Sequence, residues 1–207
     1  MPTILPMILA FDTSSAACTA ALFDRAGTCV ARRDEMIGRG HSERLVPMLD
    51  ELLEGRKADS ILVGVGPGSF TGIRVAVAAA HGLAIGWGAE MAGMSSLALI
   101  AASTESPGEI AVAVSGGHGE LFIQEFEGAQ ATGDLLNLPP EQAAAAITAK
   151  IVVGSGANAL VEARGRGEAR DGWPSAAHSL ELPESLRSLP PRPIYARAPD
   201  AQPRQAA

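Results

Sequence analysis

A glycine-rich segment, GVGPGSFTGIR, begins at Gly64 and has the residue types of a phosphate-binding turn. It follows the apolar run SILVGVG and precedes an alanine-rich helix, and the free N–H groups at such a helix start can accept an anion. A Walker-type loop needs a lysine after its second glycine, and none occurs here. Ser69 stands where the dinucleotide fingerprint requires its third glycine. A structural turn is the favoured interpretation, and a phosphate site is the alternative.

A second candidate is the sequence DTSS at Asp12, which ends the first apolar run. An acid at a strand end before a hairpin of small residues is the arrangement used by actin-like phosphotransferases, where the acid handles the metal and the hairpin contacts phosphate. A strand-end aspartate also commonly accepts hydrogen bonds from nearby backbone N–H groups. The residues of this degenerate nucleotide or anion site are Asp12, Ser14, Gly66, Gly68, Ser69 and Thr71.

Other constellations that carry chemistry are missing from the sequence. The four histidines are scattered without paired spacing, and neither Ser115 nor Ser155 lies in a G-x-S-x-G elbow. Cys18 and Cys29 lie in predicted strands without a second ligand nearby, so we expect small core side chains in a reducing compartment. The sequence predicts no catalytic residue and no metal site.

Composition and charge limit the classes of partner that the chain is expected to bind. A chain of 207 residues with 47% hydrophobic content can bury a core, and a net charge of −7 provides no long-range attraction for a nucleic acid. The N-terminus lacks the basic and small-residue features of a secretory signal. The apolar stretch from Val75 to Trp87 is alanine- and glycine-rich and shorter than the roughly 20 apolar residues that span a bilayer. We expect a cytoplasmic protein without a membrane segment.

The elements that would position these residues repeat along the chain. An apolar strand and a hairpin come first, then helices around Glu43–Leu53 and Phe70–Ile85 alternate with buried strands. After the turn residues ESPGE, an apolar strand, a hairpin and helices follow again. The pattern predicts an internally duplicated α/β fold with mixed sheets. The predicted parts are residues 1–106, a smaller subdomain at 107–198, and a disordered tail at 199–207.

The helix from Phe70 to Ile85 is apolar on nearly all sides, with small side chains that allow close approach of a second helix. One side can face the sheet, and the other is predicted to meet either a partner protein or the second half of the chain. The predicted interface residues are Leu45, Met48, Leu49, Leu52, Gly72, Ala76, Ala79, Ala80 and Leu83.

Four segments in this order resemble the N-terminal half of the TsaB (YeaZ) family: ILAFDTSSAACTAALFD, GHSERLVPMLDELL, VGVGPGSFTGIRVAVAAAHGLAIG and GMSSLALIA. PIYARAP near the end resembles the closing element of that family. The resemblance implies the actin-like ATPase (ASKHA) fold, with two ribonuclease-H-like subdomains whose mixed sheets are flanked by helices.

The resemblance also implies a function. TsaB proteins are non-catalytic, activating subunits in the synthesis of N6-threonylcarbamoyladenosine in tRNA, and they pair through their N-terminal helices with a TsaD (Kae1-like) transferase. TsaE, an ATPase, belongs to the wider complex. The implied state of the chain alone is a homodimer without cofactors, tRNA is met only indirectly, and ATP or ADP with Mg²⁺ is expected only at the level of the complex.

Two alternatives remain open at this point. A stand-alone actin-like ATPase or small-molecule kinase would need Asp12 and the Ser69–Thr71 turn to hold a magnesium nucleotide. A glycoprotease activity, an old label of this superfamily, would need a nucleophile or metal ligands. The chain departs from the family at VSGGHGELF, where Ser115 replaces an acid and Gly116, Gly117 and His118 replace a basic stretch.

Overall fold

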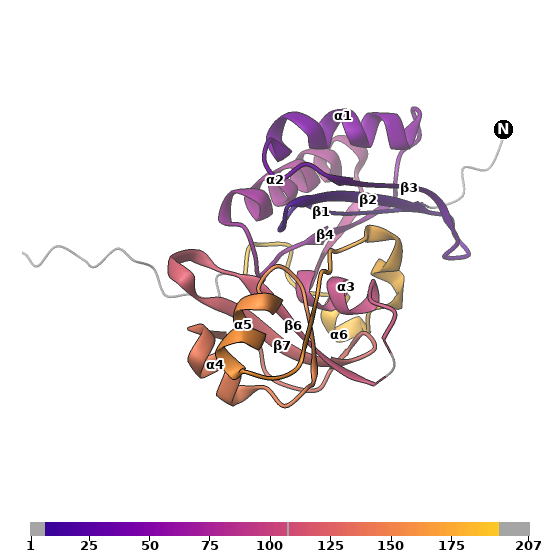
Figure 1. Cartoon of the computed structure of the whole chain (residues 1–207). Helices are drawn as coiled ribbons and strands as arrows, with labels where there is room; N and C mark the ends of the chain where they lie inside the picture. The colour runs from indigo at the N-terminus through magenta and orange to yellow at the C-terminus, as the bar shows by residue number, and fades with distance from the viewer. Residues whose placement is uncertain (1–6, 107, 195–207) are drawn as a thin grey trace, which may run out of the picture.

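The computed structural model describes residues 7–106 and 108–194, and its first half forms a five-stranded mixed sheet (Figure 1). The strand order is β3-β2-β1-β4-β5, with β1 antiparallel to β2 and parallel to β4. Pairing of Ala10 with Ala21 and Leu62 fixes the register at the centre. The strands are β1 (Ile8–Asp12), β2 (Ala17–Phe23), β3 (Cys29–Met36), β4 (Ser60–Gly64) and β5 (Glu90–Met94).

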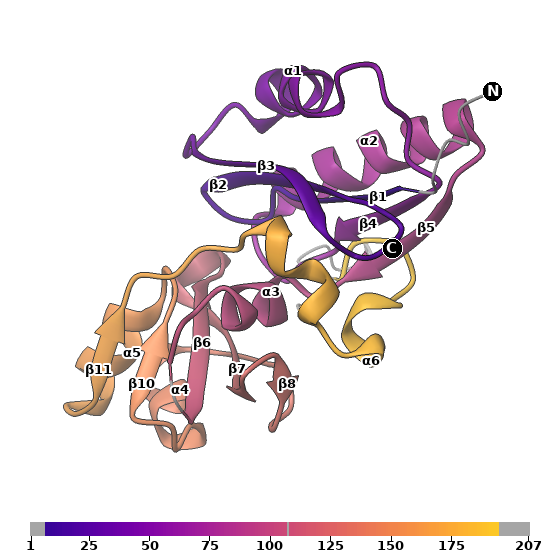
Figure 2. The same ribbon diagram turned by 90° about the vertical axis from the view of Figure 1, so that its right-hand side faces the viewer.

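Two helices, α1 (His41–Leu53) and α2 (Phe70–Trp87), cover one face of this sheet (Figures 1 and 2). Leucine and methionine recur on α1 at helical spacing and are buried against Leu9 and Phe11 of β1. The helix begins at His41 after Gly40, a left-handed residue that supplies no side-chain cap. Ser69 caps α2 by accepting a hydrogen bond from the Gly72 N–H at 3.2 Å.

The second sheet repeats this plan. Its strand order is β11-β10-β6-β7-β8, with β9 also pairing with β7. The β6–β7 hairpin corresponds to β1–β2, and β10 and β11 lie parallel to β6 as β4 and β5 do to β1, which confirms the predicted duplication. The elements are β6 (Glu109–Ser115), β7 (Leu121–Glu127), β8 (Gln130–Ala131), β9 (Leu136–Leu138), β10 (Ile151–Val153) and β11 (Glu168–Arg170), with α4 (Pro140–Ala146) and α5 (Ala157–Arg164) on the face away from the first sheet (Figure 1).

Three short elements fill the space between the sheets: α3 (Ser96–Ala102), the 3-10 helix η2 (Ala176–Glu181) and α6 (Glu184–Arg187) (Figure 2). The core in this layer joins Phe23 of the first sheet to Val112 and Phe126 of the second. Because β1 alternates its side chains, Leu9 and Phe11 face the helix pair while Ala10 faces this middle layer. The first lobe, built on the sheet of β1–β5, and the second lobe, built on the sheet of β6–β11, therefore share the core of this middle layer.

The segment after Ser175 returns to the first sheet. Gly93 and Leu189 exchange backbone hydrogen bonds of 2.7 and 3.0 Å, and the Ile194 N–H donates to the Val65 carbonyl at 2.8 Å. A subdomain division at residue 106 stays a prediction. It assigns residues 176–194 to the second subdomain, although they contact the N-terminal sheet. The expected disordered tail, 199–207, lies outside the described residues.

Helix α2 is longer than the apolar stretch in the sequence indicates. It has 18 residues and a mean hydropathy of 1.2, and among the described residues it is the one helix that passes a length and composition test for crossing a membrane. The expectation that this segment is too short was therefore wrong, although core helices of soluble proteins pass the same test. Five of its residues are buried, namely Gly72, Ile73, Ala76, Val77 and Ala80.

The two cysteines differ in their surroundings. Cys18 lies in the core with its Sγ 3.8 Å from Met48 Sδ, and burial raises its pKa to about 12, so this thiol stays protonated. Cys29 is exposed on the edge strand β3, which contradicts the prediction of a core position. Burial of part of its surface also raises the pKa of Cys29.

Candidate functional site

Asp12, at the end of β1, is fully buried. Its Oδ1 accepts hydrogen bonds from the Ser14 N–H and hydroxyl, each at 2.7 Å, and its Oδ2 accepts from the Ser96 hydroxyl. A Cβ on Gly64 would lie 1.8 Å from Asp12 Oδ2, so the carboxylate rests directly on the β4 backbone. This burial contradicts the predicted anion-binding role of Asp12, because the side chain ties the β1–β2 turn to the start of α3 instead.

The glycine-rich turn after β4 is packed against the β1–β2 turn by direct backbone contact. The Ser69 N–H donates to the Ser14 carbonyl at 2.6 Å, and the Thr13 hydroxyl donates to the Gly72 carbonyl at 2.7 Å. A Cβ on Gly72 would lie 1.9 Å from the Thr13 carbonyl oxygen, and one on Gly68 would lie 2.3 Å from the Ser14 carbonyl oxygen. Close approach of two backbones is sufficient to explain these glycines.

A cleft of about 590 Å³ lies between the lobes, where the starts of α1 and α2 face the end of β6. Of the predicted anion-binding residues it brings together Ser14, Ser69 and Thr71, whereas Asp12, Gly66 and Gly68 do not line it. Sequence reasoning missed its other polar groups, because they come from separate turns. These are Ser15, Arg39, His41, Ser42, Glu43, Ser115, Ser155 and Trp173.

Chemical groupings typical of an enzyme are missing in the part of the chain that the structure describes. No group of three or more His, Cys, Asp or Glu side chains there can hold a metal ion. Ser115 and Ser155 bond to each other's backbone at the ends of β6 and β10, at 3.1 and 3.2 Å. These hydrogen bonds engage both hydroxyls with backbone, whereas a serine nucleophile needs a histidine base as its partner.

An apolar groove of about 360 Å³ runs between α1 and α2 on their outer side. Val46 at its rim is 63% exposed, and Ile85 on the outer side of α2 is 84% exposed, so two large apolar side chains face solvent on this helix pair. At the start of α2, Phe70 is also exposed, with the Arg74 guanidinium 3.4 Å from its ring centroid. The groove is lined by Val46, Leu49, Asp50, Leu53, Ala79, Gly82, Leu83 and Trp87.

The structure corrects the residues expected at an interface. Leu45, Met48, Leu52, Ala76 and Ala80 are at most 2% exposed and Leu49 is 3% exposed, and Gly72 is also buried. These residues hold the helices onto the sheet and have little or no surface to offer a partner. Of the predicted set, Ala79, Leu83 and the edge of Leu49 reach the groove.

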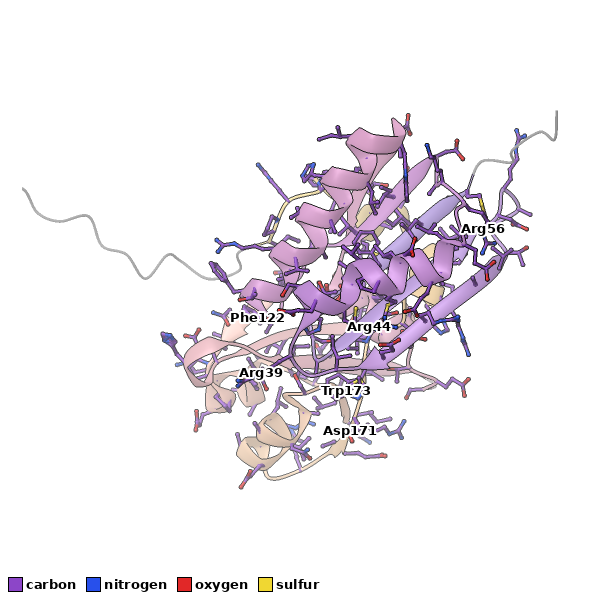
Figure 3. The ribbon with its side chains drawn as sticks, turned by 90° about the horizontal axis from the view of Figure 1, so that it is seen from above. Arg39, Arg44, Arg56, Phe122, Asp171 and Trp173 are labelled. Atoms are coloured by element: carbon purple, nitrogen blue, oxygen red, sulfur yellow. The ribbon has the colours of Figure 1, made fainter. Side chains whose placement is uncertain are left out.

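Ion pairs hold α1 on the first sheet from its outer side. The Arg44 guanidinium lies between Glu35 of β3 and Glu51 of α1, with Nε 2.7 Å from Glu35 Oε2 and Nη1 2.8 Å from Glu51 Oε1 (Figure 3). Hydrogen bonds from Arg44 lower the pKa of both carboxyl groups and raise the pKa of Arg44. The helix pair is therefore anchored at its edge as well as in the core.

The strand order of both lobes, with helices on their outer faces, defines an actin-like fold. A family model described as "TsaD: tRNA N6-adenosine threonylcarbamoyltransferase" matches residues 34–156. The chain belongs to this family, and its relatives include proteins named TsaB.

Two solved structures and two curated sequences illustrate the likeness. YeaZ from Pseudomonas aeruginosa superimposes with a TM-score of 0.76 at 27% identity and covers 92% of this chain and 100% of that one. A second structure, described as an uncharacterized protein from P. aeruginosa with similarity to peptidase YeaZ, gives a TM-score of 0.75 at 29% identity over 93% of this chain and 100% of that one.

The "tRNA threonylcarbamoyladenosine biosynthesis protein TsaB" of Haemophilus influenzae is 42% identical over 84 residues, which are 38% of this chain and 35% of that protein. TsaB of Escherichia coli is 33% identical over 128 residues, 58% of this chain and 54% of that protein. The aligned part of the chain thus spans about a third to a half of these curated relatives.

Proposed function

We propose that this chain is a non-catalytic subunit of the machinery that makes N6-threonylcarbamoyladenosine in tRNA, and that it acts by binding a TsaD-type transferase through α1 and α2. The relatives named for this pathway support the process, and the family match supports a partner of the same fold. The observation that carries the proposal is the apolar groove between the two helices, with Val46 and Ile85 exposed on the same helix pair.

The groove has the composition of a helix-packing surface. Ala79 and Gly82 on α2 leave room for the backbone of another helix to approach, and Leu83 and Trp87 supply larger apolar walls. Burying an exposed side chain of the size of Ile85 contributes about 1.5–3 kcal/mol, so a few such contacts suffice to bring two helix pairs together. Because the partner shares the fold, its equivalent helices would meet these two around a pseudo-two-fold axis.

We also propose how the chain assembles with itself and with the other components. In the absence of the transferase, two copies of the chain would cover the groove for each other as a homodimer. TsaE and tRNA would join at the level of the larger complex, and the net charge of −7 favours an indirect role in tRNA binding. ATP or ADP with Mg²⁺ would likewise be bound by the complex, in the cytoplasm.

A stand-alone ATPase or kinase receives less support. Asp12, which would hold the magnesium nucleotide, has no exposed surface and three hydrogen bonds from neighbouring serines. Binding of magnesium ATP to the isolated chain, abolished by Asp12→Ala, would revive this alternative. The glycoprotease alternative would gain support from proteolysis by the isolated chain that a chelator abolishes.

The test of the proposed interface is light scattering on a sizing column, with the chain alone and mixed with the TsaD-type protein of the same organism. Gly82→Arg is the informative variant, because no atom lies within 4 Å of a Cβ at this position and the side chain would project into the groove. The substitution also removes a helix-interior glycine, which favours the monomer fold by about 0.5–1 kcal/mol.

We expect wild type to form a heterodimer at the expense of homodimer and Gly82→Arg to remain monomeric with an unchanged or higher melting temperature. Ala145→Arg, on the exposed side of α4 in the second lobe, is the matched control and should leave both assemblies intact. A Gly82→Arg chain that still binds the transferase at wild-type affinity would refute the groove as the interface.

A further inference from the structure

The apolar groove between α1 and α2 contains one charged side chain, that of Asp50. The other residues that line it are apolar, among them Val46 of α1 and Leu83 and Trp87 of α2. Asp50 is exposed, and its side chain forms no ion pair or hydrogen bond with a described residue. A protein that fills the groove would cover this carboxylate, and covering a charge without an opposite charge beside it costs free energy.

The arginines nearest to Asp50 in the sequence are engaged by other groups. Arg44, the one arginine of α1, bonds to Glu35 of β3 and to Glu51, at 2.7 and 2.8 Å (Figure 3). Arg56, just beyond the end of α1, donates to two backbone carbonyls of the last turn at 2.8 and 3.0 Å. Both arginines therefore stabilise the first lobe itself, and the cation that would pair with Asp50 has to come from another protein.

A second copy of this chain does not supply that cation, because it would present the same two helices. Helix α1 has three carboxylates and one arginine, which is already bonded. The part of α2 that lines the groove, residues 79–87, contains no lysine or arginine. Arg74 precedes this part by more than one helical turn, and its guanidinium lies over the Phe70 ring. In a homodimer across the groove, each Asp50 would thus face apolar side chains or other carboxylates.

We propose that Asp50 determines which protein occupies the groove. It favours a partner helix that has a lysine or arginine among apolar side chains, and it disfavours a second copy of this chain. The inference rests on the proposed function, because it concerns the same surface, and it adds the chemistry of the partner. Apolar contacts in the groove provide affinity for either occupant, whereas the charge separates the two, since an unpaired or like charge penalises the wrong one.

The test compares Asp50→Asn with wild type in both assemblies. Asparagine keeps the size of the side chain and removes its charge, and substitution at an exposed position should leave the fold intact. Sedimentation equilibrium gives the dissociation constant of the homodimer, and titration calorimetry gives that of the heterodimer with the TsaD-type protein of the same organism, each at low and at high salt. Asp134→Asn, which removes an exposed carboxylate of the second lobe, is the matched control. Gly82→Arg tests the groove itself.

At low salt, we expect Asp50→Asn to bind the transferase about fivefold to tenfold more weakly than wild type, and to form a homodimer that is several-fold tighter. Both differences should shrink at high salt, because salt screens the charges. Asp134→Asn should match wild type in both assays. If the wild-type homodimer is too weak to measure, the heterodimer affinities of Asp50→Asn and Asp134→Asn decide alone.

Two failures can be told apart. If Gly82→Arg abolishes binding of the transferase but Asp50→Asn changes neither affinity, or changes both in the same direction, the role of Asp50 is overturned and the groove remains the interface. If Gly82→Arg binds the transferase as tightly as wild type does, the proposed interface is overturned, and the role of Asp50 with it.

Discussion

The two lobes have the same strand plan, yet they differ in the helices that cover it. Helices α1 and α2 of the first lobe have 13 and 18 residues, whereas α4 and α5 of the second have 7 and 8. Short helices cover their sheet and little more. The longer pair covers the first sheet and still presents the groove and Ile85 on its outer side. The added helix length of the first lobe therefore carries the surface through which we propose that the chain binds its partner.

Unlike the helices, the glycine-rich turns of the two lobes are alike. In the first lobe, the turn after β4 packs on the end of β1, with the Ser69 N–H bonded to the Ser14 carbonyl. In the second, the turn after β10 packs on the end of β6, where the Gly156 N–H donates to the Ala113 carbonyl at 2.9 Å. A glycine turn at this place is thus a requirement of packing in each lobe, and its presence alone does not indicate a nucleotide site.

The largest effect is expected from Ala76→Arg, because Ala76 is fully buried between α2 and the sheet. An arginine there would bury an unpaired charge and overfill the core, at a cost of about 3–5 kcal/mol or more, which is comparable to the whole stability of many domains. Chemical denaturation followed by circular dichroism measures the loss. Ala78→Arg, on the exposed side of the same helix, is the control and should fold as wild type. A stable, folded Ala76→Arg monomer would show that this face of α2 is not core.

A second comparison tests whether the two glycine turns are equivalent. Gly72→Ala would place a Cβ 1.9 Å from the Thr13 carbonyl oxygen, and Gly154→Ala would place one 2.5 Å from the Ala113 carbonyl oxygen at a φ of 114°. We expect each substitution to lower the free energy of unfolding by roughly 2–4 kcal/mol, since backbone must move in both. Gly82→Ala, where space is open, should raise it by about 0.5–1 kcal/mol. Loss of stability in only one turn would show that the lobes have diverged there.

Much of this arrangement follows from local sequence signals. Apolar periodicity predicts the buried strands, the hairpins and helix α1, and Ser95 caps α3 as its position before an apolar run indicates. What the sequence did not reveal depends on distant contacts. Small apolar residues surround α2 on all sides, so no pattern tells which of them face the sheet. That is why Ala76 and Ala80 were expected at an interface although they are in the core.

The functional groups show the same limit. The burial of Asp12 depends on Gly64 and Ser96, which come from a different strand and helix, and no local pattern announces those contacts. The cleft is assembled from turns separated by more than a hundred residues, so His41 and Trp173 gave no joint signal. The C-terminal return to β5 rests on close approach of Gly93 to the backbone at Pro190, in a region without periodicity.

An intermediate effect is expected from removing the acid that ends β1. Asp12→Ala would leave the Ser14 N–H and the Ser14 and Ser96 hydroxyls without their acceptor in a buried place. We expect a net cost of about 1–3 kcal/mol, because the substitution also removes the desolvation cost of the buried carboxylate. Ser115→Ala, at the corresponding strand end of the second lobe, removes only one exposed hydroxyl donor and should change stability by less than about 0.5 kcal/mol. Urea denaturation measures the free energy of unfolding of the two variants. Equal losses of stability would refute a structural role specific to Asp12.

The smallest effect should come from the ion pairs that hold α1 to β3. Arg44 lowers the pKa of Glu35 and Glu51, so these contacts stabilise the fold above the ordinary carboxyl pKa and lose their effect as the pH falls through the lowered values. All three side chains are near solvent, and salt screens them. Arg44→Gln should therefore lower the melting temperature slightly at neutral pH and low salt, and the difference in melting temperature from wild type should vanish on acidification or in high salt.

The second lobe contains a counterpart, the Arg170–Glu168 pair within β11. Arg170→Gln should have less effect on the melting temperature, because this pair ties no helix to a sheet. A pH-independent gap for Arg44→Gln would assign the loss to packing of the arginine stem rather than to charge.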